Sequence, residues 1–285
     1  LRRRYCASEK MQASLLFSLG LYVSLPIMIK AIFFDIDGTL VGFRDHRISS
    51  STSHALARMR RKGVKLFIAT GRHPLGVDNL GDERFDGYIY MNGGLCTIDG
   101  RTVYRNPLDA AAVGRLLDAL PQSDIACVFD TEQAWYINRA DERVRAMNAM
   151  INVDIPLIDP ERLRGLDIFQ ITPYLPPQEE WRVLQYMPEV KHSRWCDPIF
   201  DINPRDGGKG VALLQAARCL GISPAQTMAF GDGGNDTEML LAAGIGVAMG
   251  NATDELKDAA DYITSSVDDD GIARAIEHFE REGVL

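Results

Sequence analysis

The stretch KAIFFDIDGTL at residues 30–40 decides the fold of this chain. Its apolar residues run from Ala31 to Phe34, and Asp35 and Asp37 follow almost directly. A continuous apolar run of this length is typical of a parallel β-strand that helices cover on both faces. In an open parallel sheet, ligands bind outside the carboxyl ends of the strands. We therefore predict that Asp35 and Asp37 stand at the ligand-binding edge of such a sheet.

Four more apolar runs end in polar or glycine-rich loops in the same way. They are residues 64–69 before Thr70-Gly71-Arg72, 88–91 before Asn92-Gly93-Gly94, 227–230 before Gly231–Asp236, and 245–249 before Gly250-Asn251. Helical patterns lie between these runs, and several are followed by the glycine that is common at a helix end. The alternation predicts an α/β fold with a Rossmann-like, doubly wound parallel sheet.

Residues 108–195 have a different pattern. Strand-like and helical runs still alternate there, but few of them end in an acidic or glycine-rich loop. We expect an inserted α/β cap domain at 108–195, within a catalytic core formed by residues 28–107 and 196–285. The dipeptide Asp99-Gly100 lies between two further strand-like runs and predicts a type I′ hairpin, which we assign to the core.

Residues 1–27 differ from the rest of the chain. They begin with four basic residues, Arg2 to Arg4 and Lys10, before a mostly apolar run from Ala13 to Met28. Such a start resembles a secretory signal or a membrane anchor, but the run is shorter than the ~20 residues that cross a bilayer. We expect an N-terminal extension outside the folded core, with a targeting segment as the alternative.

The composition of the 285 residues is that of an ordinary globular protein, with 46% hydrophobic and 25% charged residues. The net charge of −8 argues against nucleic acid as the main partner, and we expect no stable association with a membrane. The five cysteines are scattered without a C-x-x-C spacing, which is typical of reduced thiols in a cytoplasmic protein. The sequence does not indicate an oligomeric state.

The polar loops concentrate carboxylates at one edge of the predicted sheet. Asp35, Asp37, Asp232 and Asp236 carry too much negative charge to lie close together unpaired. A divalent cation such as Mg²⁺, which binds carboxylates, water and phosphate, would offset that charge. The same cation would recruit an anionic ligand, which is otherwise unexpected for an acidic chain.

Thr70, Gly71 and Lys209 supply groups that bind phosphate oxygens. They offer a hydroxyl, an unhindered backbone N–H and a cation at the start of a helix. Each alone has an ordinary structural explanation, as a turn residue, a helix cap or a solvated side chain. Their joint occurrence at strand ends and a helix start favours a phosphate site.

With these motifs the chain resembles the haloacid dehalogenase superfamily of aspartyl-phosphate phosphatases. Four elements carry the resemblance: DIDGTL at 35–40, Thr70-Gly71-Arg72, Lys209-Gly210, and GDGGND at 231–236. The resemblance covers nearly everything from Met28 to the C-terminus. The large α/β insertion between the second and third elements is similar to that of the Cof-type subfamily of sugar-phosphate phosphatases, and within it to bacterial hexose-phosphate phosphatases.

The resemblance implies the roles of the acidic residues. Asp35 would attack phosphorus and form an aspartyl-phosphate, while Asp37 would protonate the leaving alcohol and then activate a water. Mg²⁺ would be held by the Asp35 carboxylate, the Asp37 backbone carbonyl and Asp232. Asp236 would orient ligands or water nearby.

The resemblance also implies a phosphate-binding set. Thr70, Gly71, Lys209 and Asn235 would stabilise the transferring phosphoryl group. The inserted domain would act as a lid that excludes water and contacts the leaving group. The implied enzyme is an Mg²⁺-dependent phosphatase of small phosphorylated metabolites, with sugar phosphates as the favoured substrates.

Two other functions stay open at this point. A phosphomutase of the same superfamily shares the aspartyl-phosphate, although such enzymes usually carry a smaller, helical lid. A non-enzymatic, receiver-like phospho-acceptor also places an Asp pair, a Thr and a Lys on a parallel sheet, but it has no inserted domain. A receiver accepts one phosphate, whereas a phosphatase releases it repeatedly.

Overall fold

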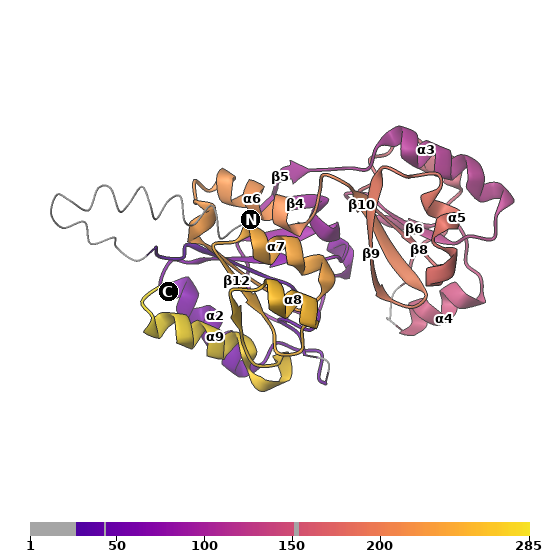
Figure 1. Cartoon of the computed structure of the whole chain (residues 1–285). Coiled ribbons are helices and arrows are strands. Elements are labelled where there is room, and N and C mark those ends of the chain that lie inside the picture. The colour runs from indigo at the N-terminus through magenta and orange to yellow at the C-terminus, as the bar shows by residue number, and fades with distance from the viewer. Residues whose placement is uncertain (1–26, 43, 151–153) are drawn as a thin grey trace.

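The computed structural model describes residues 27–42, 44–150 and 154–285, which form two β-sheets with helices packed against them (Figure 1). We call the part built on the larger sheet the core unit and the part built on the smaller sheet the cap unit. The larger sheet has the order β13 (Tyr262–Ile263), β12 (Ile245–Ala248), β11 (Thr227–Gly231), β1 (Ala31–Phe34), β2 (Lys65–Ala69), β3 (Gly87–Tyr90), β4 (Leu95–Ile98), β5 (Arg101–Arg105). Its first six strands are parallel.

Helices cover both faces of the core sheet, as predicted for a doubly wound fold. They are α2 (Ser50–Arg61), α6 (Lys209–Cys219), α7 (Thr237–Ala242), α8 (Asp254–Ala259) and α9 (Gly271–Arg281). Successive residues of a strand point to opposite faces. Ile32 and Phe34 accordingly pack with α2 and α9, whereas Ala31 and Phe33 pack with α6, α7 and α8. Burial on both faces explains why β1 is a continuous apolar run.

Strands β4 and β5 form the predicted hairpin and add two antiparallel strands to the edge of the core sheet. Asp99 and Gly100 at its tip both have positive φ, 48° and 74°. A type I′ turn requires positive φ at both central residues, so the hairpin prediction and its assignment to the larger sheet are confirmed.

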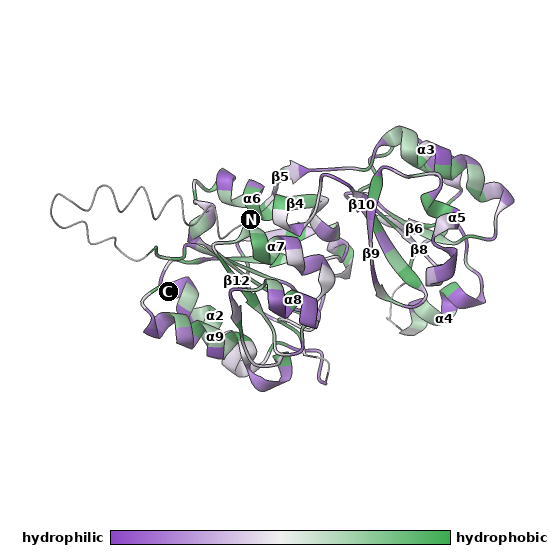
Figure 2. Cartoon of the chain, in the orientation of Figure 1, coloured by the Kyte–Doolittle hydropathy of each residue, from purple (hydrophilic) through white to green (hydrophobic). Residues whose placement is uncertain are grey.

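The cap unit contains a five-stranded sheet in the order β7 (Trp135–Ile137), β6 (Cys127–Asp130), β8 (Gln170–Pro173), β10 (Ile199–Pro204), β9 (Val190–Cys196). Its helices are α3 (Ala110–Ala119), α4 (Glu142–Met150) and α5 (Trp181–Leu184). Helices α3 and α5 pack on one face of this sheet, and α4 packs on the other. In Figure 2 the hydrophobic colour follows strands of both sheets, while the helices carry hydrophobic and hydrophilic colour side by side.

The second boundary of the insertion differs from the prediction. The core was expected to resume at residue 196, but β10 lies in the cap sheet between β8 and β9. The strand β10 carries the buried polar residues Asp201 and Asn203, so its sequence lacks the apolar pattern of a central strand. We propose that the cap unit extends through Pro204.

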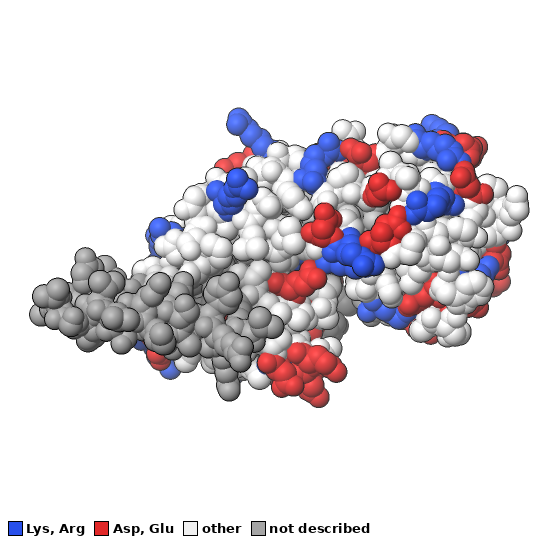
Figure 3. Space-filling model, turned by 45° about the horizontal axis from the view of Figure 1, so that its top comes forward, with Lys and Arg blue, Asp and Glu red and all other residues white. Residues whose placement is uncertain are grey.

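The remaining sequence predictions concern the N-terminal segment and the charge. Residues 1–26 of the predicted extension lie outside the described residues. Among the described residues, no helix has both the length and the apolar character needed to span a bilayer. On the face drawn in Figure 3, acidic and basic side chains are interspersed rather than gathered into a continuous basic surface.

Candidate active site

The predicted nucleophile Asp35 lies in a cluster of ion pairs at the carboxyl end of β1. Its backbone N–H donates to the carbonyl of Phe230 (3.1 Å), which extends the pairing of β1 with β11. Nζ of Lys209 donates to Oδ1 of Asp35 (2.6 Å) and to Oδ1 of Asp236 (2.7 Å). Lys209 is the first residue of α6, and its side chain is fully buried. Three predicted site residues from distant parts of the chain therefore meet here.

Burial and charge oppose each other in this cluster. Burial raises the pKa of Asp35 well above its usual range, and the attraction of Lys209 counteracts part of that rise. Burial alone would lower the pKa of Lys209, but the attraction of Asp236 and Asp35 raises it overall. Lys209 is therefore a buried cation shared by two carboxylates, and it leaves part of their negative charge uncompensated.

Asp236 organises the loop that follows β11. Its Oδ2 accepts hydrogen bonds from the backbone N–H groups of Asp232 (3.1 Å) and Gly233 (3.0 Å), and its Oδ1 is held by Lys209. The buried carboxylate thus closes the GDGGND loop on itself and fixes it to the start of α6. These contacts occupy both oxygens of Asp236, which suits a residue that orients its neighbours.

Asp232 is tied to the loop after β1 by two residues that had no predicted role. The hydroxyl of Thr39 donates to Oδ1 of Asp232 (3.1 Å), and Nδ2 of Asn251 donates to its Oδ2 (3.1 Å). Asn251 also donates to the carbonyl of Gly38 (2.9 Å). Both Thr39 and Asn251 lie in loops at strand ends, and that position was the available signal for them.

The acidic cluster fits a divalent cation. Asp35, Asp232 and Asp236 each offer one carboxylate oxygen, and these three oxygens lie within 4.8 Å of one another. Burial, reinforced by Asp236, raises the pKa of Asp232 to about 7. A bound divalent cation would favour the ionised form and reverse this shift. All the donors are hard oxygens, which suits Mg²⁺.

The predicted acid–base residue Asp37 is bound by Arg72 rather than by the lysine of the cluster. Nε of Arg72 lies 2.9 Å from Oδ2 of Asp37, and Nη2 bonds the other oxygen. Nη1 of the same guanidinium donates to the carbonyl of Gly76 (2.9 Å) and to Oδ1 of Asn79 (3.1 Å). The Asp37 side chain is 57% exposed, so it faces the solvent from which a substrate would enter.

The predicted phosphate-binding residues Gly71 and Asn235 both contact Asn92, which follows β3. Nδ2 of Asn235 donates to Oδ1 of Asn92 (2.9 Å). A β-carbon added to Gly71 would lie 3.1 Å from both ends of the Asn92 carboxamide. Thr70 is buried, and its hydroxyl accepts a hydrogen bond from the backbone N–H of Arg72 (3.1 Å). No role was predicted for Asn92, although its loop was recognised as one of the polar strand ends.

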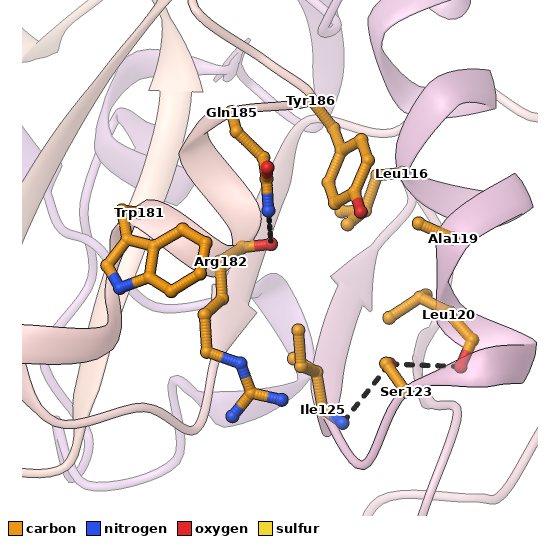
Figure 4. Close-up of a pocket in the computed structure, with 9 residues that line it drawn as sticks. All are labelled: Leu116, Ala119, Leu120, Ser123, Ile125, Trp181, Arg182, Gln185 and Tyr186. Atoms are coloured by element: carbon orange, nitrogen blue, oxygen red, sulfur yellow. Dashed lines mark hydrogen bonds between the residues drawn. The ribbon is translucent and has the colours of Figure 1, made fainter.

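A separate pocket of about 130 Å³ lies in the cap unit (Figure 4). It is lined by Leu116, Ala119, Leu120, Ser123, Ile125, Trp181, Arg182, Gln185 and Tyr186. None of these is a predicted site residue. The guanidinium of Arg182 is already paired with Asp124 and Glu179. This pocket is therefore distinct from the carboxylate cluster at the end of β1.

Known proteins with a similar sequence or structure include phosphatases. The phosphatase candidate YkrA of Bacillus subtilis (strain 168) is 36% identical over 87% of this chain and 96% of its own length. The HMP-PP phosphatase of Yersinia pseudotuberculosis is 30% identical over 88% of this chain and 96% of its own length. The solved structure of the HAD subclass IIB sugar phosphatase BT4131 is 38% identical, with a TM-score of 0.81, and the match covers 90% of this chain and all of that one.

The match to a protein family covers most of the chain. Residues 32–276 match the haloacid dehalogenase-like hydrolases, and this range includes the core strands from Ile32 onward, the cap unit and every predicted site residue. The chain therefore belongs to the haloacid dehalogenase-like hydrolase family and is a phosphoric monoester hydrolase.

Proposed function

We propose that this enzyme is an Mg²⁺-dependent phosphatase that hydrolyses small sugar phosphates through an aspartyl-phosphate on Asp35. The observation that carries the proposal is the buried contact of 2.6 Å between Lys209 and Asp35. It fixes one carboxylate oxygen of Asp35. No hydrogen bond to the other oxygen, Oδ2, is found among the described residues, so Oδ2 is free to act as nucleophile or metal ligand.

In the first step, a carboxylate oxygen of Asp35 attacks phosphorus and the bond from phosphorus to the leaving oxygen breaks. Asp37, in its protonated form, gives its proton to that oxygen, and an alcohol leaves. In the second step, Asp37 takes a proton from a water whose oxygen attacks phosphorus. The bond from Asp35 to phosphorus then breaks, inorganic phosphate is released and both residues return to their starting states.

The proposed Mg²⁺ ligands are the Asp35 carboxylate, the Asp37 backbone carbonyl and Asp232, with Asp236 supporting them. When bound, the ion would offset the repulsion between the carboxylates and the phosphate. The phosphoryl oxygens would be bound by Lys209 and by Thr70, Gly71 and Asn235. The positions of Lys209 beside Asp35 and of Asn235 beside Gly71, through Asn92, support this assignment.

Sugar phosphates are proposed because BT4131, at 38% identity, is a sugar phosphatase. The HMP-PP phosphatase is less similar, at 30% identity.

We propose the cytoplasm as the compartment, because Cys96, Cys127, Cys196 and Cys219 are free thiols.

The proposal is tested with the full chain, Mg²⁺ and a panel of sugar phosphates, nucleotides, pyridoxal phosphate and flavin mononucleotide. We expect repeated release of inorganic phosphate, fastest on sugar phosphates, with loss of activity in EDTA and recovery on adding Mg²⁺. Asp35→Asn should abolish turnover, whereas Asp258→Asn, at an exposed position in α8, should not. Near-normal activity of Asp35→Asn would refute the aspartyl-phosphate. An isomerised sugar phosphate instead of free phosphate would indicate a phosphomutase, and a single stoichiometric phosphorylation would indicate a receiver.

A further inference from the structure

One buried side chain of the cap unit reaches the phosphate-binding loop of the core unit. Gln170, the first residue of β8, is 4% exposed. Its Nε2 donates to the carbonyl of Gly71 (3.1 Å) and to Oδ2 of Asp130 (3.2 Å). Its Oε1 accepts from Nδ2 of Asn92 (3.0 Å) and from Nδ2 of Asn203 (3.1 Å). Both donor positions and both acceptor positions of the carboxamide are therefore occupied.

Asn92 extends these contacts to the other side of the phosphate site. Its Nδ2 donates to Gln170 and to Oδ2 of Asp201 (3.0 Å), while its Oδ1 accepts from Asn235 (2.9 Å). Its backbone N–H donates to the carbonyl of Thr70 (3.0 Å). Asn92 has φ of 51°, a conformation that asparagine adopts more readily than most residues. One asparagine thus contacts the loop after β2, the loop after β11 and the cap sheet.

The glycines after Asn92 let this loop approach its neighbours closely. A β-carbon on Gly93 would lie 2.3 Å from the carbonyl oxygen of Gly208 and 2.9 Å from the backbone nitrogen of Lys209. A β-carbon on Gly94 would lie 3.0 Å from Cβ of Phe169, the residue before Gln170. The Asn92-Gly93-Gly94 loop is therefore packed between the start of α6 and the cap sheet, and its position depends on both.

We propose that Gln170 and Asn92 are positioning residues that make the geometry of the phosphate-binding loops depend on contact with the cap unit. Hydrogen bonds between buried amides are directional, so Gly71, which Gln170 contacts directly, and Asn235, which it reaches through Asn92, keep their positions only while Gln170 is in place. The cap unit would then affect the binding of the phosphoryl group itself, as well as the leaving group. This inference rests on the proposed phosphatase function.

The test uses orthovanadate, which mimics the phosphoryl group and has no leaving group. We would measure its inhibition constant in the presence of Mg²⁺, and kcat and KM for p-nitrophenyl phosphate. Gln170→Met keeps the length of the side chain and removes all four hydrogen bonds. We expect its inhibition constant for vanadate to rise by about tenfold, which corresponds to about 1.4 kcal/mol. Gln185→Met is the matched control, because among the described residues the Gln185 side chain donates only to the carbonyl of Arg182, and it lines the separate pocket (Figure 4).

A second variant keeps the test decisive if Gln170→Met does not fold. Gln170→Glu is nearly isosteric and retains both acceptor positions, but its carboxylate loses the donors to Gly71 and Asp130. We expect the same weakening of vanadate binding. Unchanged inhibition by vanadate in a folded variant would overturn the proposal, including the case in which only KM for the substrate rises. Absence of phosphatase activity in the unaltered protein would instead refute the proposed function.

Discussion

The guanidinium of Arg72 binds both carboxylate oxygens of Asp37, through Nε at 2.9 Å and through Nη2. The pair connects the loop after β2 with the loop after β1, and it fixes the direction of the group that we propose as general acid and base. Two parallel hydrogen bonds restrict a carboxylate far more than a single contact does. Nη1 of Arg72 donates in turn to the carbonyl of Gly76 and to Oδ1 of Asn79, and these bonds hold the guanidinium in its orientation toward Asp37.

Arg72→Lys should therefore reduce catalysis in a way that depends on the leaving group. An ammonium group cannot reproduce the two parallel bonds, so Asp37 would lose its fixed orientation. For an alkyl phosphate, whose leaving oxygen needs a proton, we expect kcat to fall by about 10²-fold. For p-nitrophenyl phosphate, whose leaving group is stable as an anion, the fall should be much smaller. Equal losses of kcat on both substrates would contradict this role.

Lys209 should be essential for stability as well as for activity. Its fully buried ammonium group is shared by Asp35 and Asp236, whose side chains are 9% and 1% exposed. Lys209→Met would leave two buried carboxylates without their cation, and we expect the free energy of unfolding to fall by about 3–5 kcal/mol. Urea denaturation measures this loss.

The matched control for Lys209 is Lys257→Met. Lys257 pairs at 4.0 Å with Asp254, whose side chain is 99% exposed. Surface pairs of this kind contribute about 0–1 kcal/mol, so the control should remain close to the unaltered protein. A similar, small loss in both variants would show that the buried carboxylates do not depend on Lys209.

The edge of the core sheet that carries the site was predictable, because each of its strands can be recognised from a short, continuous stretch of sequence. Each strand of the core sheet that ends at the site is an apolar run followed at once by polar or glycine residues. Parallel pairing then brings the ends of β1, β2, β3, β11 and β12 to one edge. The contacts of Asp35 with Lys209, of Thr39 with Asp232, and of Asn235 with Asn92 agree with that convergence.

The junction with the cap unit was not predictable in the same way. Strand β10 alternates buried Asp201 and Asn203 with Phe200 and Ile202, and all four are buried. A pattern of this kind is typical of a strand with one face in solvent, but here Asp201 accepts a hydrogen bond from Asn92 of the core unit and Asn203 donates one to the carbonyl of Met91. Gln170 likewise contacts a loop 99 residues away in the sequence. Spacing along the chain contains no information about such pairs.

Gly93→Ala tests how closely the Asn92 loop approaches α6. At φ of 96°, alanine would be strained, and its β-carbon would overlap the carbonyl oxygen of Gly208 at 2.3 Å. Gly63→Ala is the matched control, since Gly63 has φ of 80° and no atom within 4 Å of the added carbon. The control should lose about 1–2 kcal/mol of stability from backbone strain alone.

We expect Gly93→Ala to lose more stability than this control and to lower kcat, because the displaced backbone includes the start of α6 at Lys209. Thermal unfolding and steady-state kinetics measure the two effects. Equal destabilisation of both variants would mean that the loop moves away without disturbing Lys209.

Asp130 should make the stability of the protein fall as the pH rises. This residue is buried at the end of β6, and within the described part of the chain its Oδ1 has no hydrogen-bond partner. Burial, reinforced by the nearby carboxyl of Asp201, raises the pKa of Asp130 to about 8, against the smaller opposing effect of the hydrogen bond from Gln170. The folded state thus favours the protonated carboxyl, whereas the unfolded chain loses that proton near pH 4. The contribution of protonated Asp130 to the free energy of unfolding is complete below pH 4, and it is lost as the pH rises from about 4 to about 8.

Asp130→Asn should remove this dependence on pH. The difference in the free energy of unfolding, variant minus unaltered protein, should increase in favour of the variant by about 2–3 kcal/mol between pH 5 and pH 7, since each pH unit contributes about 1.36 kcal/mol. A loss of packing or of hydrogen bonds would shift this difference equally at every pH. The slope of the difference against pH therefore reports only the ionisation of Asp130. Asp154→Asn, at an exposed position in the cap unit, is the control for the substitution itself. A difference that does not change with pH would show that Asp130 is ionised in the folded protein, and hence that water or another donor reaches its second oxygen.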